Sequence, residues 1–521
     1  MRRESMIDLL RKHGEEPWDV LIIGGGATGL GAAVEAASRG YSTILVEQHD
    51  FAKGTSSRST KLVHGGVRYL QQGDVGLVLE ALHERGLLKK NAPHLVRNQA
   101  FIIPNYEWWN GPFYTIGMKV YDAMAGKLGL GPSLHISKEE TMKAIPNLKE
   151  EGLRGGVIYH DGQFDDARLA VNLAQTAVNN GGVVINYMKV TGLVKNQDQL
   201  IQGADLEDME TKKSYRIYAK SVINATGVFA DSILRMDDPA APKSILPSQG
   251  VHIVLEREFL QGDSAIMIPK TADGRVLFAV PWHKKVVVGT TDTLVKKESL
   301  EPRALEEEIK FILQTAGAYL TKKPTRKDVK SIFAGLRPLA APEKGKATKE
   351  ISRGHKIMVS LSGMITVIGG KWTTYRKMGE DTIDKAIMIG NLPETVSVSK
   401  DLSIHGAVNH FDPEDPLYIY GTDKRFLLQL VEQKPELGKK LHPSLPFIRA
   451  EVLWAATAEM ARSVEDVLAR RARALFLDAR ASIEMAPEVA SILATALNKD
   501  QQWQKNQVEE YTKLAKGYIL E

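Results

Sequence analysis

The 521-residue sequence contains no cysteine, which excludes disulfide frameworks, thiolate-bound iron–sulfur clusters, thiolate zinc sites and redox-active cysteine pairs. It has no uncharged apolar run of about 18 residues, so we expect no transmembrane helix. No secretory signal is apparent at the N-terminus. The 13 histidines do not fall in metal-ligand spacing, and we expect no metal site. A net charge of +5 is too small to indicate a nucleic-acid partner, but it is compatible with an anionic substrate or lipid surface.

The length predicts roughly three domains at about 150 residues each. Apolar runs that alternate with helical patterns predict an α/β core. Its expected strands are Trp18–Ile23, Tyr41–Glu47, Gly182–Asn186, Lys220–Ala225, Ile357–Ser360 and Met364–Ile368. Short β-branched segments predict an inserted antiparallel sheet: Gly250–Leu255, Arg275–Val280 and Lys285–Gly289. From about residue 400 the patterns are helical: Asp423–Gln433, Ala450–Ala461, Val464–Leu477 and Ala486–Leu497.

The strongest local signal is a glycine-rich turn between the first strand and the alanine-rich helix predicted over Thr28–Arg39. Gly24 allows a tight turn, Gly26 lets a pyrophosphate approach the backbone, and Gly29 lets the helix pack closely on the sheet. The first N–H groups of that helix, including the one at Thr28, would hold the anion. Glu47 ends the next predicted strand, where a carboxylate can bind a ribose. We therefore predict a Rossmann-like dinucleotide site, although a lone motif of this kind also occurs as an ordinary turn.

Three later segments indicate which dinucleotide is bound. A polar stretch over 55–69 follows the predicted ribose site, Asn224–Gly227 follows a strand, and Gly369–Arg376 opens a helix. One nucleotide site served by such distant segments suits a long cofactor such as FAD better than an exchangeable NAD. Each segment alone could equally be an ordinary strand-to-helix loop.

The chain resembles the FAD-dependent, quinone-linked glycerol-3-phosphate dehydrogenases. The segments that carry the resemblance are IIGGGATGLGAAVEAASRG (22–40), TSSRSTKLVHGGVRYL (55–70), DGQFDDARL (161–169), NATG (224–227), GTTD (289–292), GLRPL (335–339), GGKWTTYRKM (369–378) and RSVEDVLARRARALFLD (462–478). The resemblance therefore covers nearly the whole chain. The expected architecture is a discontinuous FAD-binding domain (18–100, 160–245 and 335–395), a substrate-binding cap (101–159 and 246–334) and a C-terminal helical domain (400–521).

The resemblance also implies roles for particular residues. The expected FAD-binding residues are Gly24, Gly26, Thr28, Gly29, Glu47, Thr55, Ser56, Lys61, His64, Gly65, Gly66, Gly227, Gly335, Gly370, Lys371, Trp372 and Thr373. The residues expected around the substrate are Arg68, Tyr69, Arg337, Arg353 and Lys371. The implied reaction is oxidation of sn-glycerol 3-phosphate to dihydroxyacetone phosphate, with a hydride passing to FAD.

The chemistry of that reaction favours particular residue types. Guanidinium groups bind two phosphate oxygens at once, so Arg337 and Arg353 are the leading phosphate ligands. A base must take the hydroxyl proton, and we rank His64 first, His252 second and a deprotonated Lys371 third. Arg68 would stabilise the alkoxide or the reduced flavin. A lone arginine or histidine is more often structural than catalytic, and each of these assignments is a hypothesis.

Without cysteines the chain has no internal thiol relay, so the electron acceptor is external. The resemblance implies a membrane quinone, with the protein cytoplasmic and peripheral on the inner face of the cell membrane; the alternative is an oxidase that reduces oxygen to hydrogen peroxide.

The aromatic run 104–121, with Lys119 and Lys127, fits either a lipid headgroup boundary or a buried cluster. The arginine-rich stretch at Arg470, Arg471 and Arg473 could be a surface helix, a membrane patch or an interface between domains or subunits, and we favour the interface. A homodimer is one option for the oligomeric state. A flavin-binding module without turnover is the remaining alternative.

Overall fold

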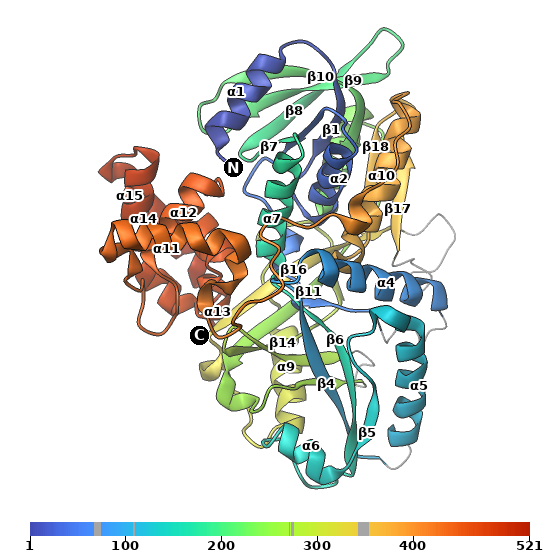
Figure 1. Ribbon diagram of the computed structural model, residues 1–521, viewed down its shortest axis with the longest axis vertical. Coiled ribbons are helices and arrows are strands. Elements are labelled where there is room, and N and C mark those ends of the chain that lie inside the picture. The colour runs from blue at the N-terminus through green and yellow to red at the C-terminus, as the bar shows by residue number, and fades with distance from the viewer. Residues whose placement is uncertain (67–73, 108–109, 270, 272–275, 342–353) are drawn as a thin grey trace.

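A computed structural model describes residues 1–66, 74–107, 110–269, 271, 276–341 and 354–521 of the chain. Two sheets and a helical region make up the molecule (Figure 1). The first sheet lies in the upper part of that view and the second in the lower part, with the C-terminal helices beside both. Both expected sheets and the helical C-terminal domain are therefore present.

The first sheet surrounds the predicted glycine turn. Its central strands are parallel, as apolar runs buried on both faces require. Their order is β17 (His355–Val359), β18 (Ile365–Gly369), β10 (Ser214–Asn224), β1 (Trp18–Ile23), β2 (Thr43–Val46) and β7 (Val183–Ile185), with β9 (Ile201–Asp208) and β8 (Met188–Lys195) continuing from β10. Three packed helices cover it: α2 (Ala27–Ser38), α7 (Asp166–Asn179) and α10 (Tyr375–Ile389). The helix α1 (Arg3–His13) docks on β7.

The second sheet is mostly antiparallel. Its strands in order are β15 (Thr293–Leu294), β11 (Ile245–Glu256), β14 (Lys285–Gly289), β13 (Leu277–Trp282), β12 (Ala265–Ile268), β4 (Arg97–Asn105), β6 (Gly155–Gln163) and β3 (Leu62–Val63), with β16 (Ser331–Ala340) beside β11 and β5 (Leu134–Ile136) beside β6. The helices around it are α4 (Val75–Asn91), α5 (Asn110–Ala125), α6 (Lys138–Ala144) and α9 (Glu306–Tyr319), whereas α8 (Ala230–Asp237) contacts β8 and β18 of the first sheet. Because β4, β6 and β16 belong to this sheet, the domain boundaries expected at residues 101, 160 and 335 fall inside strands.

The C-terminal helices are α11 (Lys424–Gln433), α12 (Arg449–Ala458), α13 (Ala474–Leu477), α14 (Ala479–Leu497) and α15 (Gln501–Lys516). The single helix expected over 464–477 is wrong. A wide helical turn covers Asp466–Arg471, and Arg473 then adopts a left-handed backbone with φ of 62° before α13 begins. The interruption lets successive arginines point in different directions into the protein.

Those arginines bind acidic side chains near the first sheet: Asp50, which follows β2, and Asp166, the first residue of α7. Arg471 donates to both carboxylate oxygens of Asp50 at 2.8 and 2.9 Å, and Arg470 donates to the same carboxylate at 2.5 Å. Arg473 donates to Asp166 at 2.9 Å. All three guanidinium groups are buried. The stretch is therefore an interface between domains, and the surface-helix and membrane-patch alternatives are wrong.

No helix in the described part of the chain is long and apolar enough to cross a membrane. The aromatic run 104–121 is only partly described, since Trp108 and Trp109 lie outside the described residues. Tyr121 is buried, and its hydroxyl contacts the Asp161 carboxylate at 2.9 Å and accepts from the Gly65 N–H at 2.8 Å. This end of the run therefore belongs to the protein interior.

Candidate functional site

A cavity of about 500 Å³ opens where the carboxyl ends of β1, β10 and β18 meet the second sheet. This edge of a parallel sheet is where dinucleotides bind in doubly wound folds. Many of the residues expected at the site line it: Gly24, Gly26, Thr28, Glu47, Thr55, Ser56, His64, Gly227, His252, Gly335, Arg337, Gly370, Lys371, Trp372 and Thr373.

A second cavity, of about 310 Å³, adjoins the first and extends towards the second sheet. Thr55, Thr60, His64, Arg337 and Lys371 line both cavities, so the two meet at a boundary that carries cations and an imidazole. Gly66 lines the second cavity only. The arrangement provides a larger compartment for a dinucleotide and a smaller one for a second molecule.

The glycine turn leaves no room for side chains. Gly24 has φ of +112°, and a Cβ there would lie 2.7 Å from the carbonyl oxygen of Ala225. A Cβ at Gly29 would lie 1.9 Å from the Gly24 carbonyl oxygen, which explains the close packing of α2 on β1. Gly26 directly precedes α2 and lines the cavity. An anion placed here meets bare backbone and the positive end of the helix dipole.

Glu47 follows β2 and lines the first cavity. Its carboxylate accepts the N–H of Gly25 at 2.7 Å and the N–H of His49 at 2.8 Å, which fix its orientation. Burial raises the pKa of Glu47, and the two N–H donors oppose that rise. Each carboxylate oxygen can accept a second hydrogen bond, so the group can also bind a ribose hydroxyl.

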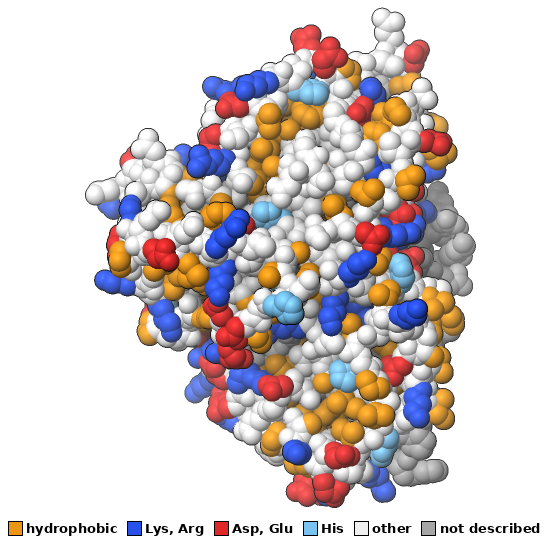
Figure 2. Space-filling model, viewed as in Figure 1, with side chains coloured by type: hydrophobic (Ala, Val, Ile, Leu, Met, Phe, Trp, Pro, Cys, Tyr) orange, Lys and Arg blue, Asp and Glu red, His pale blue; other side chains and the backbone are white. Residues whose placement is uncertain are grey.

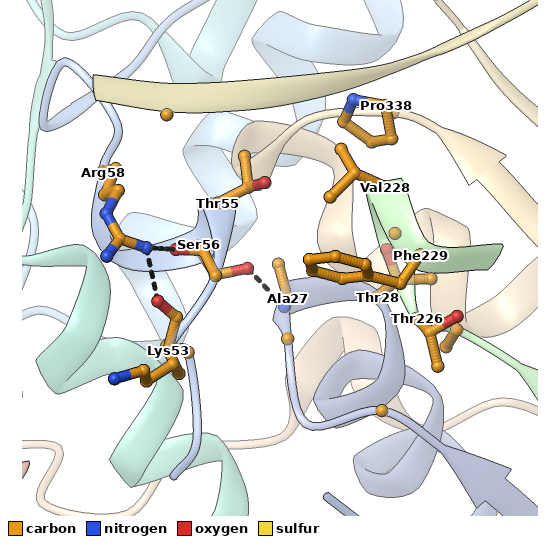
Figure 3. A pocket seen from close by; sticks show the side chains of 18 of the residues that line it. Ala27, Thr28, Lys53, Thr55, Ser56, Arg58, Thr226, Val228, Phe229 and Pro338 are labelled. Atoms are coloured by element: carbon orange, nitrogen blue, oxygen red, sulfur yellow. Dashed lines mark hydrogen bonds between the residues drawn. The ribbon is translucent and has the colours of Figure 1, made fainter. Parts of the chain in front are cut away.

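Two loops from distant parts of the chain join at the turn. The Ser56 hydroxyl accepts the Ala27 N–H at 2.9 Å, at the start of α2 (Figure 3). The Trp372 indole donates to the Ser56 carbonyl at 2.8 Å, and the His64 N–H donates to the Thr373 hydroxyl at 3.2 Å. These bonds bring the segments predicted from three separate motifs around one cavity.

The cationic end of the site is formed by β16 and the turn after β18. Arg337 on β16 donates to the Thr290 hydroxyl at 3.3 Å and to the Thr291 carbonyl at 3.2 Å, and it pairs with Asp292 at 3.5 Å. Lys371 lies in the turn that leads to α10. The two predicted cations, from different elements, therefore lie on the walls of the same two cavities.

Both predicted histidines line the first cavity. Burial lowers the pKa of His64 to about 4, and the positive charges of Lys371 and Arg85 add to that effect. His252 stacks on Phe333, with ring centroids 4.9 Å apart, and its Nε2 lies 2.9 Å from the Thr60 hydroxyl. Burial also lowers the pKa of His252 well below its ordinary value. Both imidazoles are therefore neutral at pH 7, and the lowered pKa makes each a weaker base than an ordinary histidine.

Three expected cofactor ligands are not on the walls of either cavity. The Lys61 ammonium is buried and donates to Asp166 at 2.7 Å and to the Ser57 carbonyl at 2.8 Å, so it supports the interior instead. Gly65 faces α4 and α5, where a Cβ would lie 2.4 Å from Leu82. Gly29 does not line the cavity, and its role is to let α2 pack closely against the end of β1. Arg68, Tyr69 and Arg353 lie outside the described residues.

Other lining residues were missed by the sequence analysis. Lys53, Arg58 and Thr60 line the first cavity, and Asp161 and Tyr159 line the second. Thr290, Thr291 and Asp292 hold Arg337, and they lie in the segment GTTD (289–292). That segment was the available signal, because a polar triplet directly after a buried strand marks a strand end, where sites form.

The residues present fit an FAD molecule. The cavity has a volume of about 500 Å³, and its walls include a glycine turn at a helix N-terminus and a carboxylate fixed by backbone N–H groups. When bound, FAD supplies the hydride acceptor that protein side chains lack.

Comparisons with known proteins agree with this assignment. The family model described as FAD dependent oxidoreductase matches residues 19–376, and the C-terminal domain of alpha-glycerophosphate oxidase matches residues 368–504. The probable mitochondrial glycerol-3-phosphate dehydrogenase of Caenorhabditis elegans is 40% identical over 542 residues, covering 98% of this chain and 74% of that protein. The human mitochondrial glycerol-3-phosphate dehydrogenase is 39% identical, covering 97% and 74%.

Solved structures give the same picture. The glycerol-3-phosphate dehydrogenase from Bacillus halodurans, complexed with FAD, superposes with a TM-score of 0.81 at 28% identity, covering 99% of this chain and 97% of that one. An L-alpha-glycerophosphate oxidase from Mycoplasma pneumoniae shares the fold at a TM-score of 0.58 and 20% identity, covering 73% and 96%. The chain is thus an oxidoreductase with FAD as its cofactor, and it belongs to the glycerol-3-phosphate dehydrogenase family.

Proposed function

We propose that the protein oxidises sn-glycerol 3-phosphate to dihydroxyacetone phosphate and passes the two electrons to a quinone at a membrane surface. The observation that carries the substrate assignment is the pair of cations, Arg337 and Lys371, on the walls shared by the two cavities. A site for a small phosphorylated polyol needs one group that binds the phosphate and, a few ångströms away, polar groups that act on the reacting hydroxyl. The boundary between the two cavities offers both kinds of group.

Arg337 is the phosphate ligand in this proposal. Its guanidinium is held by Thr290, Thr291 and Asp292, so its direction is fixed before a ligand arrives. A guanidinium fork stays charged at every working pH and binds two phosphate oxygens at once. Pre-orientation reduces the ordering cost of binding.

His64 accepts the proton of the substrate hydroxyl as the hydride leaves C2. Burial keeps the imidazole neutral, since it lowers the pKa of His64 to about 4. Lys371 is close enough to contribute to that lowering, and the same positive charge stabilises the alkoxide as it develops. His252 is the second candidate for the base.

The two roles separate kinetically. We expect Arg337→Ala mainly to raise KM, because it removes phosphate binding, and His64→Ala mainly to lower kcat by about 100-fold, because it removes the base. His83→Ala on the exposed surface of α4 is the control and should change neither. Steady-state kinetics with glycerol 3-phosphate measure all three variants. A kcat within about threefold of the parent for His64→Ala would rule that base out.

An exposed apolar surface supports the membrane part of the proposal. Leu79 on α4 and Ile116 and Val120 on α5 are exposed, and Ile116 keeps 67% of its surface. Lys119 on α5 and Lys127, directly after α5, are also exposed. Figure 2 shows hydrophobic side chains along the edge that α5 occupies in Figure 1. Apolar groups with flanking lysines suit a surface of anionic lipid.

Reoxidation of the reduced flavin distinguishes a quinone from oxygen as acceptor. After anaerobic reduction, the flavin should be reoxidised at least tenfold faster by a quinone in anionic vesicles than by air-saturated buffer. Zwitterionic vesicles with the same quinone should be slower, because the lysines then lack anionic partners. Fast reoxidation by air with stoichiometric hydrogen peroxide would instead establish an oxidase.

A further inference from the structure

One wall of the first cavity is a loop between β2 and β3, residues 53–61, which we call the cofactor loop. Lys53, Thr55 and Ser56 line the cavity, and the Ser56 hydroxyl binds the Ala27 N–H at the start of α2. The shape of this loop therefore sets the width of the cavity at the glycine turn, where the cofactor phosphates are expected.

Arg58 holds the cofactor loop from within. Its Nη1 donates to the Lys53 carbonyl at 2.5 Å and to the Gly54 carbonyl at 3.0 Å (Figure 3). The side chain is only 3% exposed. Gly335 makes room for it, because a Cβ at that position would lie 2.9 Å from the Cβ of Arg58. One guanidinium therefore bridges two successive carbonyls of the loop and fixes its turn.

The Nη2 atom of the same guanidinium binds Glu301 and Tyr518, which lies near the C-terminus. Arg58 Nη2 donates to the Tyr518 hydroxyl at 3.1 Å and to Glu301 at 2.6 Å, and the Tyr518 hydroxyl donates to Glu301 at 2.9 Å. Tyr518 is itself buried, and its carbonyl accepts the Ile332 N–H at 2.9 Å, which anchors the tail on β16. Its ring packs edge-on against Phe476.

Two further contacts link the same loop to the C-terminal domain. The Lys53 ammonium pairs with the carboxylate of Glu465, and Arg473 donates to the Ser57 carbonyl at 3.0 Å. Side chains from two C-terminal segments, 462–478 and the one that holds Tyr518, thus reach Lys53, Ser57 and Arg58. These contacts add to the hydrogen bonds that Leu336, Asp166 and Trp372 make with the same loop. A loop that is already ordered draws less on the free energy of binding.

We propose that the C-terminal domain keeps the cofactor loop in its FAD-binding shape, with Tyr518 and Arg58 as positioning residues. This inference concerns retention of FAD and is independent of the proposed substrate and electron acceptor. Neither residue needs to touch the reacting atoms. Their effect is to order the loop before the cofactor arrives, so that less free energy is spent on ordering when it binds.

The test is a comparison of two buried tyrosines. Tyr518→Phe removes the hydroxyl that binds Arg58, while Tyr511→Phe removes an equally buried hydroxyl that instead binds Ser482 at 2.8 Å. We expect Tyr518→Phe to raise the dissociation constant for FAD about tenfold, and Tyr511→Phe to change it less than twofold. Flavin fluorescence on reconstituting the apoprotein measures the constant without any substrate, and circular dichroism gives the melting temperature of each apoprotein.

A second variant keeps the test decisive if Tyr518→Phe folds poorly. Arg58→Lys retains the charge but cannot span the two loop carbonyls and Tyr518 together. Arg58→Lys should weaken FAD binding at least tenfold. The double variant Arg58→Lys/Tyr518→Phe should weaken it little further, because both substitutions break the same linkage between the loop and Tyr518. An unchanged dissociation constant in Arg58→Lys would overturn the proposal. Equal losses of melting temperature in both tyrosine variants, with FAD affinity unaltered, would also overturn it.

Discussion

Gly24→Ala is expected to abolish FAD binding, with a rise of at least 100-fold in the dissociation constant. The new Cβ would lie 2.7 Å from the carbonyl oxygen and 2.9 Å from the carbonyl carbon of Ala225, and both atoms belong to the backbone next to β10. The φ of +112° adds strain for any residue with a side chain. The turn must open to relieve the contact, and opening it displaces the N–H groups at the start of α2 that would hold the cofactor phosphates.

The control for that substitution is Gly76→Ala on α4, where a Cβ would meet no atom within 4 Å. Flavin absorbance per mole of purified protein measures both variants, and circular dichroism checks that each is folded. Gly76→Ala should retain a full complement of flavin. A folded Gly24→Ala protein with parental flavin content would show that the cofactor does not use this turn.

Lys371→Met should lower kcat/KM by about 1000-fold while leaving flavin bound. Lys371 lines both cavities, and its charge acts on the neighbouring His64. Charge that develops on the substrate oxygen in a site shielded from water is stabilised by such a group far more than it would be in solution. A 1000-fold loss of rate corresponds to an activation barrier that is about 4 kcal/mol higher.

Lys377→Met provides the matched control, since this lysine lies on α10 and pairs with Asp381 at 2.6 Å away from the cavities. The rate of flavin reduction by glycerol 3-phosphate, followed by stopped-flow absorbance, isolates the step concerned. Lys377→Met should reduce its flavin at the parental rate. A reduction rate for Lys371→Met within tenfold of the parent would contradict the role assigned to this ammonium.

Parts of the fold were predictable because local pattern and tertiary environment agree. The apolar run of β1, the glycines after it and the alanine-rich α2 each favour the conformation that the sheet requires, and all three form as expected. The interruption near Arg473 was not predictable. The sequence analysis favoured an interface for the three arginines, but it expected one continuous helix there, because their partners Asp50 and Asp166 lie hundreds of positions away.

The site was predictable to a similar extent. Motif position identified Arg337 and Lys371, but it could not tell which way a side chain points. Lys61 lies in the middle of a motif that lines the cavity, yet its φ of +64° turns the chain and its ammonium is buried against Asp166. Arg58, in the same motif, gave no signal because its partners are carbonyl groups and the distant Tyr518.

Oxidation of glycerol 3-phosphate by the bound flavin can be measured by an anaerobic titration monitored by flavin absorbance. We expect complete bleaching near one equivalent of substrate per flavin, and no bleaching by glycerol at the same concentrations, because glycerol lacks the phosphate that Arg337 would bind. Flavin that stays oxidised with glycerol 3-phosphate, or that glycerol reduces equally well, would contradict this expectation.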